Sequence, residues 1–184
     1  MLFRSAQWLT SYSDNTATET YKRRYVFANL KQNTVVAEVR ADWIITSDLS
    51  LQVYLQPLIA AGKYDNFKVL KHPKSYNFMK YGEQGSSLIK TTFESGYSIY
   101  TLDADGEGPS NPKTIGDPNF NYISLRGSAV LRWEYLPGST LYFVWTQSRE
   151  NIESTGDFEM GHSFDTMMSI KPDNIFMIKI SYWL

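Results

Sequence analysis

Cysteine is absent from this sequence of 184 residues, and histidine occurs only twice. Without cysteine the chain forms no disulfide, no thiolate metal site and no cysteine nucleophile. No run of apolar residues approaches the ~18 that a membrane-spanning helix requires. The charges nearly balance, with 18 Lys and Arg against 19 Asp and Glu. This balance argues against a nucleic-acid partner, because such proteins carry a basic surface.

Aromatic residues, by contrast, are abundant and make up 15% of the chain. They lie in segments where apolar and polar residues alternate. Between residues 35 and 45 the odd positions are apolar, whereas Glu38, Arg40 and Asp42 occupy even positions. Successive side chains of a strand point to opposite faces, so one face is apolar and the other is charged. The same alternation returns over residues 122–136.

This alternation predicts an all-β fold with about eight long antiparallel strands. The expected strands are 3–12, 21–31, 35–45, 49–60, 87–102, 122–136, 140–150 and 174–184. Tight reversals are expected at residues 32–33, at 47–48 and at Pro137-Gly138. Long polar connections fill about 13–20, 61–86, 103–119 and 151–172. Residues 75–81 are a candidate further strand, and residues 163–169 a candidate helical turn.

Strand length favours an up-and-down transmembrane β-barrel, or an open C-terminal part of one. Crossing the hydrocarbon core takes ~9–11 residues of tilted strand, and several of these segments are long enough. The apolar faces would meet lipid or its interface, through Trp43, Leu131, Trp133, Tyr135, Phe176, Ile178, Ile180, Tyr182 and Leu184. The polar faces would line the lumen, through Glu38, Arg40, Asp42, Arg126, Arg132 and Glu134. We expect residues 1–184 to form a single barrel domain.

Few residues suggest chemistry. The acidic, glycine-rich segment containing Asp103, Asp105 and Glu107 could supply oxygen ligands to a structural Ca²⁺, but a solvated loop is the favoured reading. No other cofactor is expected. The two histidines, His72 and His162, lack further ligands at zinc-site spacing. Catalysis is therefore not the leading hypothesis.

Two blocks are similar to a known family. They are the run from Asp117 to Gly127 and the run AVLRWEYLPGSTLYFVWTQ over 129–147, supported by residues 24–28, 50–57 and 172–176. Across nearly the whole chain the sequence resembles the domain-of-unknown-function 5916 family of Bacteroidetes-type bacteria. The resemblance implies a C-terminal outer-membrane β-barrel. Longer members carry an exported N-terminal module similar to family-nine carbohydrate-binding modules.

The expected function follows from pattern and resemblance together. It is a non-enzymatic barrel of the bacterial outer membrane that anchors or serves an exported carbohydrate-handling module. The expected partners are outer-membrane lipid, the barrel-assembly machinery, and a glycan bound through the N-terminal module. The first residues lack a signal peptide, so we expect the chain to be the C-terminal fragment of a longer protein. The alternatives are a soluble carbohydrate-binding β-sandwich and a glycan hydrolase.

Overall fold

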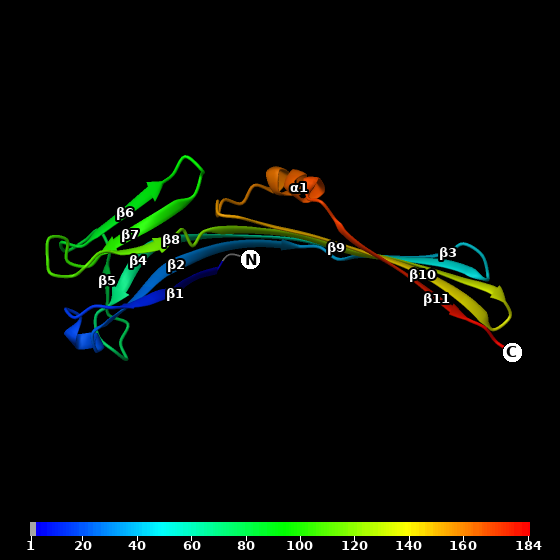
Figure 1. Cartoon of the computed structure of the whole chain (residues 1–184), viewed down its shortest axis with the longest axis horizontal. Coiled ribbons are helices and arrows are strands. Elements are labelled where there is room, and N and C mark those ends of the chain that lie inside the picture. Colours follow the sequence, from blue (N-terminus) through cyan, green and yellow to red (C-terminus); the bar gives the residue numbers. More distant parts are fainter. Residues whose placement is uncertain (1–2) are drawn as a thin grey trace. The chain divides into compact units, whose positions relative to one another are not determined.

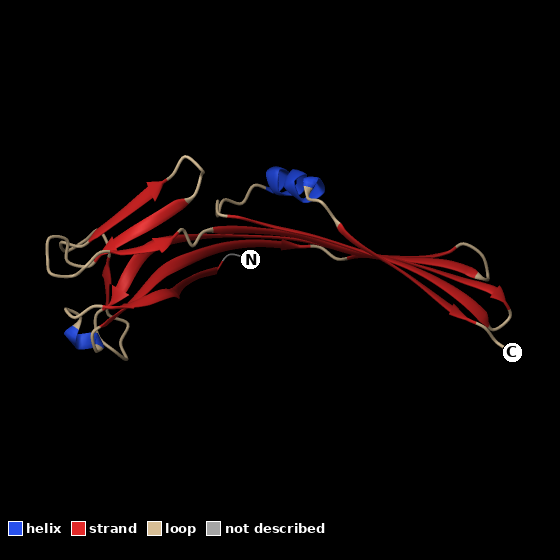
Figure 2. Ribbon diagram, viewed as in Figure 1, coloured by secondary structure: helices blue, strands red, loops and turns tan. Residues whose placement is uncertain are grey.

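The structure, a computed structural model, describes residues 3–184. Its strands are β1 (Phe3–Ser13), β2 (Arg23–Val36), β3 (Val39–Ile44), β4 (Leu49–Leu70), β5 (Phe78–Lys80), β6 (Ser87–Thr92), β7 (Ser98–Asp103), β8 (Lys113–Gly116), β9 (Phe120–Leu136), β10 (Ser139–Glu153) and β11 (Asp173–Ser181). The described chain also contains the 3-10 helix η1 (Thr18–Thr20) and the α-helix α1 (Met160–Ser169) (Figures 1 and 2). The expectation of an all-β chain is confirmed.

The strands form two sheets. In the larger sheet the order is β1-β2-β4-β9-β10-β11, and β3 and β5 each pair with β4. The smaller sheet has the order β6-β7-β8. The pairs β1–β2, β3–β4, β9–β10 and β10–β11 all run antiparallel, as do the pairs of the smaller sheet. The long strands therefore neighbour one another in chain order, as an up-and-down sheet requires.

Strands β2 and β3 both pair with β4, and the reversal predicted at residues 32–33 is wrong. Strand β2 continues through that site to Val36, and the backbone N–H of Ala37 then donates to the Pro57 carbonyl at 3.1 Å. Pairing of β3 with β4 begins with Val39 opposite Leu55 and ends with Ile44 opposite Ser50. Because proline has no N–H, the ladder is interrupted beside Pro57. The chain consequently has fewer long strands than the eight expected.

Two further boundaries differ from prediction. Strand β4 runs on to Leu70, so residues 61–70 are strand and not connection. Gly62 marks a close approach there, since a Cβ on it would lie 2.4 Å from the ring of Phe120. The expected strand 87–102 is a hairpin of β6 and β7, with Gly96 at φ 81° in its turn. The candidate strand at 75–81 contains β5.

The chain divides into two compact units. Unit 1 comprises Met1–Asn33, Ala61–Phe120 and Ser154–Asp157, and unit 2 comprises Thr34–Ala60, Asn121–Glu153 and Phe158–Leu184. In unit 1 the smaller sheet packs on the larger one. Their shared core holds Val26 from β2, Phe67 from β4 and Leu102 from β7. The rings of Phe67 and Tyr100 lie 4.6 Å apart across this interface.

Unit 2 has a smaller core. It consists of Ile59, Ile123 and Met167, with Leu125 and Phe158 packed against them. Met167 belongs to α1, which extends the predicted helical turn at 163–169 to ten residues. Elsewhere in the described part of unit 2 many side chains of the sheet are exposed, including all nine residues of β11. The prediction of a single barrel domain over residues 1–184 stays a prediction.

Candidate functional surface

The β-register in unit 2 sorts side chains onto two faces of the sheet. Strand β10 pairs with β9 without interruption from Thr140–Glu134 to Glu153–Asn121. Phe143 therefore lies between Leu131 on β9 and Ile178 on β11. Side chains directly opposite one another in a ladder share a face, so the register defines each face by residue number.

We call the first face the apolar face. Its members are Val39, Ala41, Trp43, Leu51, Val53, Leu55, Ala129, Leu131, Trp133, Leu141, Phe143, Trp145, Phe176, Ile178 and Ile180. Leu51 joins the others because it lines one shallow groove of about 290 Å³ with Ala129, Leu131, Phe143, Trp145 and Phe176. The groove lining contains no charged side chain. Strands β3, β4, β9, β10 and β11 therefore contribute to one continuous apolar surface.

Large side chains of the apolar face are exposed. Trp43 is 54% exposed, and Ile178 and Ile180 are 64% and 67% exposed. A soluble monomer rarely exposes a contiguous apolar patch of more than ~300–600 Å², which makes an exposed apolar face built from five strands unusual. The alternation in the sequence predicted that these apolar residues share one face of the sheet. Their exposure follows only from the structure.

Aromatic rings gather in two places on this surface. Beside the β9–β10 turn, the rings of Trp133 and Tyr135 lie 6.1 Å apart, and the Tyr135 hydroxyl donates to the Ser181 carbonyl at 3.3 Å. Farther along the strands, Trp145 stacks on Phe176 at 6.4 Å. Tyr182 and Leu184 follow β11 and are exposed. Six of the nine residues predicted to be lipid-facing or interfacial therefore lie on the apolar face, whereas Tyr135 lies on β9 next to it in sequence and Tyr182 and Leu184 follow β11.

We call the opposite side of the same strands the polar face. Its members include Arg40, Asp42, Gln52, Tyr54, Ser128, Arg132, Glu134, Tyr142 and Lys179, with Val130 and Val144 among them. Arg132 pairs with Glu134 at 2.9 Å, and Arg40 lies 5.3 Å from the centre of the Tyr54 ring. A groove of about 430 Å³ runs along this side, between Arg40, Gln52 and Ser128.

The remaining predicted lumen residues are also on the polar side. Arg126 lies two residues before Ser128 on β9 and so shares its face, and it lines a smaller groove with Tyr122 and Ser124. Glu38 lies in the break between β2 and β3 and pairs with Arg40 at 2.7 Å. The six charged residues predicted from alternation are therefore distributed along one side of the sheet and do not converge on a single point.

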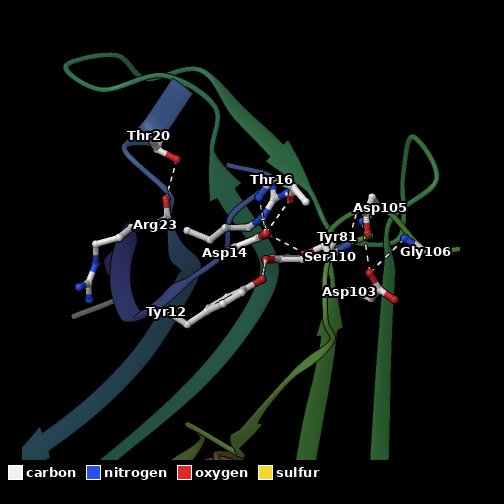
Figure 3. Close-up of polar contacts among 11 residues, drawn as sticks. Tyr12, Asp14, Thr16, Thr20, Arg23, Tyr81, Asp103, Asp105, Gly106 and Ser110 are labelled. Atoms are coloured by element: carbon white, nitrogen blue, oxygen red, sulfur yellow. Dashed lines mark hydrogen bonds and ion pairs between the residues drawn. The ribbon is translucent and has the colours of Figure 1, made fainter. Parts of the chain in front are cut away.

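The acidic loop predicted as a calcium candidate is held by its own hydrogen bonds. The Oδ1 atom of Asp103 accepts the backbone N–H groups of Asp105 and Gly106, at 3.2 and 3.0 Å (Figure 3). The Oδ2 atom of Asp105 accepts the Ser110 N–H at 3.1 Å, and Glu107 is exposed. Among residues 3–184, no three histidine or acidic side chains are grouped to hold a metal. Calcium binding stays a prediction.

The same loop is joined to the turn after β1 by a cluster that sequence reasoning missed. Asp14 is 8% exposed and pairs with Arg24. Its carboxylate also accepts the Ser110 hydroxyl at 2.7 Å and the Thr16 hydroxyl at 2.7 Å (Figure 3). Only the Asx turn at Asp14–Thr16 is local enough to be read from sequence. Ser110 is 96 residues away.

Electrostatics explain why this buried carboxyl is charged. Burial by itself raises the pKa of Asp14, but the hydrogen bonds from Arg24, Ser110 and Thr16 outweigh it. Together they hold the pKa of Asp14 well below its usual range. Nearby, burial raises the pKa of the Tyr81 phenol, whose oxygen lies 3.3 Å from that of Tyr12. We interpret this cluster as a structural clamp between the two segments, because its polar groups form hydrogen bonds and an ion pair with one another.

The histidines lie apart in exposed positions. His72 approaches Glu19 at 3.6 Å, and His162 approaches Glu153 at 3.3 Å. Among the described residues neither imidazole contacts a serine hydroxyl, so neither histidine joins a serine to an acid as in a catalytic triad. Both contacts are made at the protein surface, where the two histidine side chains are 51% and 56% exposed.

The geometry defines an antiparallel all-β protein with one exposed apolar sheet face and one polar face. No helix among residues 3–184 is both long enough and apolar enough to cross a membrane. Residues 90–184 match the model of the family described as Domain of unknown function (DUF5916). This match spans more than half of the chain, so the chain belongs to that family. No curated protein and no solved structure matches it.

Proposed function

We propose that this chain is part of an outer-membrane β-barrel in which the apolar face meets lipid and the polar face lines the lumen. In this role it is not itself an enzyme. It anchors or serves an exported module that handles carbohydrate, as the family resemblance suggests. The single observation that carries the proposal is the exposed apolar face. The opposite side of the same strands is the charged polar face.

Strand length supports this placement. Strands β9, β10 and β11 contain 17, 15 and 9 residues. A tilted strand needs ~9–11 residues to cross the hydrocarbon core, so each can span it. Aromatic residues at Trp133 and Tyr135 match the interfacial girdles that flank the apolar band of such barrels.

The turns support an orientation. The β9–β10 turn is two residues long, Pro137-Gly138, and the connection from β10 to β11 at the other end is long. Outer-membrane barrels have short periplasmic turns and long outer loops, so in the proposed orientation Pro137 and Leu184 lie on the periplasmic side. Strand β11, at the edge of the described sheet, would then be available for pairing with the barrel-assembly machinery.

The proposal has a strict consequence for the sheet edges. Among residues 3–184, β1 pairs only with β2, and β11 pairs only with β10. An unpaired backbone N–H or C=O in hydrocarbon costs several kcal/mol, and only closed barrels avoid that cost. Both edges must therefore pair with strands in the membrane.

Adjacent residues of β9 provide the test. Leu131→Arg places a charge on the apolar face, and insertion should become less favourable by about 2–4 kcal/mol. Val130→Arg places the same charge one residue away on the polar face and serves as the matched control. Folding is measured by heat-modifiable electrophoretic migration of the intact protein after envelope fractionation.

We expect Leu131→Arg to lose the folded, membrane-bound species and Val130→Arg to keep it. Equal tolerance of both substitutions would contradict the lipid-facing assignment. Recovery of the wild-type protein in the soluble fraction, without detergent, would favour a sandwich in which a second sheet covers the apolar face.

A further inference from the structure

Helix α1 packs on one particular side of the sheet in unit 2. Met167 and Ser163 of the helix are fully buried, and Met167 packs with Ile123 of β9. The Asn121 side chain donates to the Ser163 hydroxyl at 3.2 Å. Figure 1 shows α1 between the ends of β10 and β11. The helix is therefore docked on the sheet and is not a free loop segment.

The side that α1 covers is the side of the apolar face. Ile123 and Leu125 occupy odd positions of β9, as do Ala129, Leu131 and Trp133. The register between β9 and β10 has no shift from residue 121 to residue 134, so these residues share one face. The helix consequently lies on the same outward side, beyond one end of the apolar face.

The helix exposes an apolar stripe beside its buried residues. Met160, Phe164 and Met168 are each four residues apart and lie on one side of the helix. Phe164 is 51% exposed, and both methionines are similarly exposed. The other side of the helix carries His162 and Asp165. This arrangement is amphipathic, with more apolar surface than the sheet contact uses.

Distance along the strand places the helix at the edge of the expected membrane band. Tyr135 follows Leu125 by ten residues of β9, which is ~33 Å of strand at ~3.3 Å per residue. A tilt of ~40° reduces this to ~25 Å along the membrane normal, which equals the usual height of the apolar band. The aromatic pair at Trp133 marks one boundary, so α1 lies at the other.

A cation sits at the same boundary. The Arg149 guanidinium donates to the Met168 carbonyl at 2.7 Å, which satisfies one open carbonyl at the end of α1. Arginine at this depth keeps its charge in the headgroup layer while its stem lies along apolar groups. The contact holds the C-terminal turn of the helix against β10.

We propose that α1 is an interfacial helix, and that Met160, Phe164 and Met168 insert at the boundary between acyl chains and headgroups. The inference rests on the proposed function. The occupant is a lipid surface because the helix packs, through Met167, on the side of the sheet that the proposal assigns to lipid. Helices of this kind lie in the membrane plane with their apolar side ~5–10 Å deep.

The absence of cysteine allows single-cysteine variants of the intact protein to be labelled with the fluorophore NBD. The test variant is Phe164→Cys, and Asp165→Cys is its control on the polar side of α1. Ile178→Cys and Lys179→Cys probe the apolar and polar faces of β11. The proteins are reconstituted in phosphatidylethanolamine–phosphatidylglycerol vesicles containing lipid with a quenching doxyl group, either shallow or deep in the chain.

We expect the shallow quencher to reduce Phe164→Cys fluorescence about twofold more than that of Asp165→Cys, as interfacial depth requires. The deep quencher should act on Ile178→Cys and not on Lys179→Cys. If Ile178→Cys is quenched and Phe164→Cys is not, the inference fails while the proposed function stands. If Ile178→Cys is not quenched, the proposed function fails and the inference with it. If neither the lipid quenchers nor aqueous iodide quenches the fluorescence of Phe164→Cys, protein covers this position and the inference is overturned.

Discussion

At the residue scale, Asp14 connects two segments that are distant in sequence. Its carboxylate takes donors from Thr16 in its own turn, from Arg24 on β2 and from Ser110 in the loop after β7. A nearby loop contact is equally tight, because a Cβ on Gly106 would lie 2.4 Å from the Gly85 carbonyl. The loops of unit 1 are therefore positioned by specific contacts.

Asp14→Ala should lower the free energy of unfolding by about 3–5 kcal/mol at neutral pH, because it leaves the partly buried Arg24 guanidinium without its carboxylate partner. Asp65→Ala is the matched control. It removes the partner of Lys31 from an exposed ion pair, and it should cost no more than about 1 kcal/mol. Urea unfolding in detergent micelles, followed by circular dichroism, measures both. Equal effects of the two substitutions on the free energy of unfolding would contradict the structural role of the Asp14 cluster.

Acid should reduce the difference in the free energy of unfolding between the wild type and Asp14→Ala. The folded pKa of Asp14 lies below its ordinary value of ~3.9, so its ionised form stabilises the fold fully above about pH 5. That stabilisation is lost as the pH falls through ~4 toward the folded pKa. Urea unfolding repeated from pH 7 to pH 3 measures the effect. A difference that stays constant over this range would argue against a depressed pKa.

At the scale of secondary-structure elements, sequence patterns predicted the features that depend mainly on neighbouring residues. The β9–β10 hairpin is confirmed because unbroken alternation surrounds Pro137-Gly138, where Gly138 has φ 78°. The reversal expected at residues 32–33 is wrong because pairing of β2 with β4 outweighs turn propensity there. Helix α1 is longer than the predicted turn because Met167 gains burial on the sheet.

Adjacent methionines of α1 test this tertiary contribution. Met167 is 1% exposed and Met168 is 50% exposed. Met167→Ala should lower the free energy of unfolding in detergent by about 2–5 kcal/mol, since it leaves a cavity against Ile123. Met168→Ala should lower it clearly less, because Met168 is half exposed and its loss leaves no cavity in the protein. Urea unfolding and hydrogen exchange of the α1 amides measure the effects, and a similar response of the two variants would contradict docking.

At the scale of the whole molecule, the arrangement of strands decides which surfaces need partners. The long strands neighbour one another in chain order, and the sheet formed by residues 3–184 ends at β1 and β11. All nine residues of β11 are exposed. The membrane proposal depends on closing these edges, because water in a soluble protein would satisfy them and hydrocarbon would not.

Hydrogen exchange tests that requirement. In the intact protein in membranes, the amides of β11 should exchange as slowly as those of β9, because strands on both sides would pair with it. Strand β9 is the internal control, since β4 and β10 already flank it. Mass spectrometry after exchange into deuterated buffer resolves both strands. Fast exchange of the β11 amides that do not bond to β10 would show an open edge and contradict barrel closure.

The sequence by itself determined the alternation on β9, β10 and β11, the turn at Pro137-Gly138, and the family. Each depends on neighbouring residues or on short blocks. Only the tertiary structure decided that β2 and β3 both pair with β4, that Ser110 meets Asp14, and that the apolar face stays uncovered within the described chain. Those outcomes depend on contacts between segments far apart in sequence, and no local pattern encodes which of several apolar surfaces will meet.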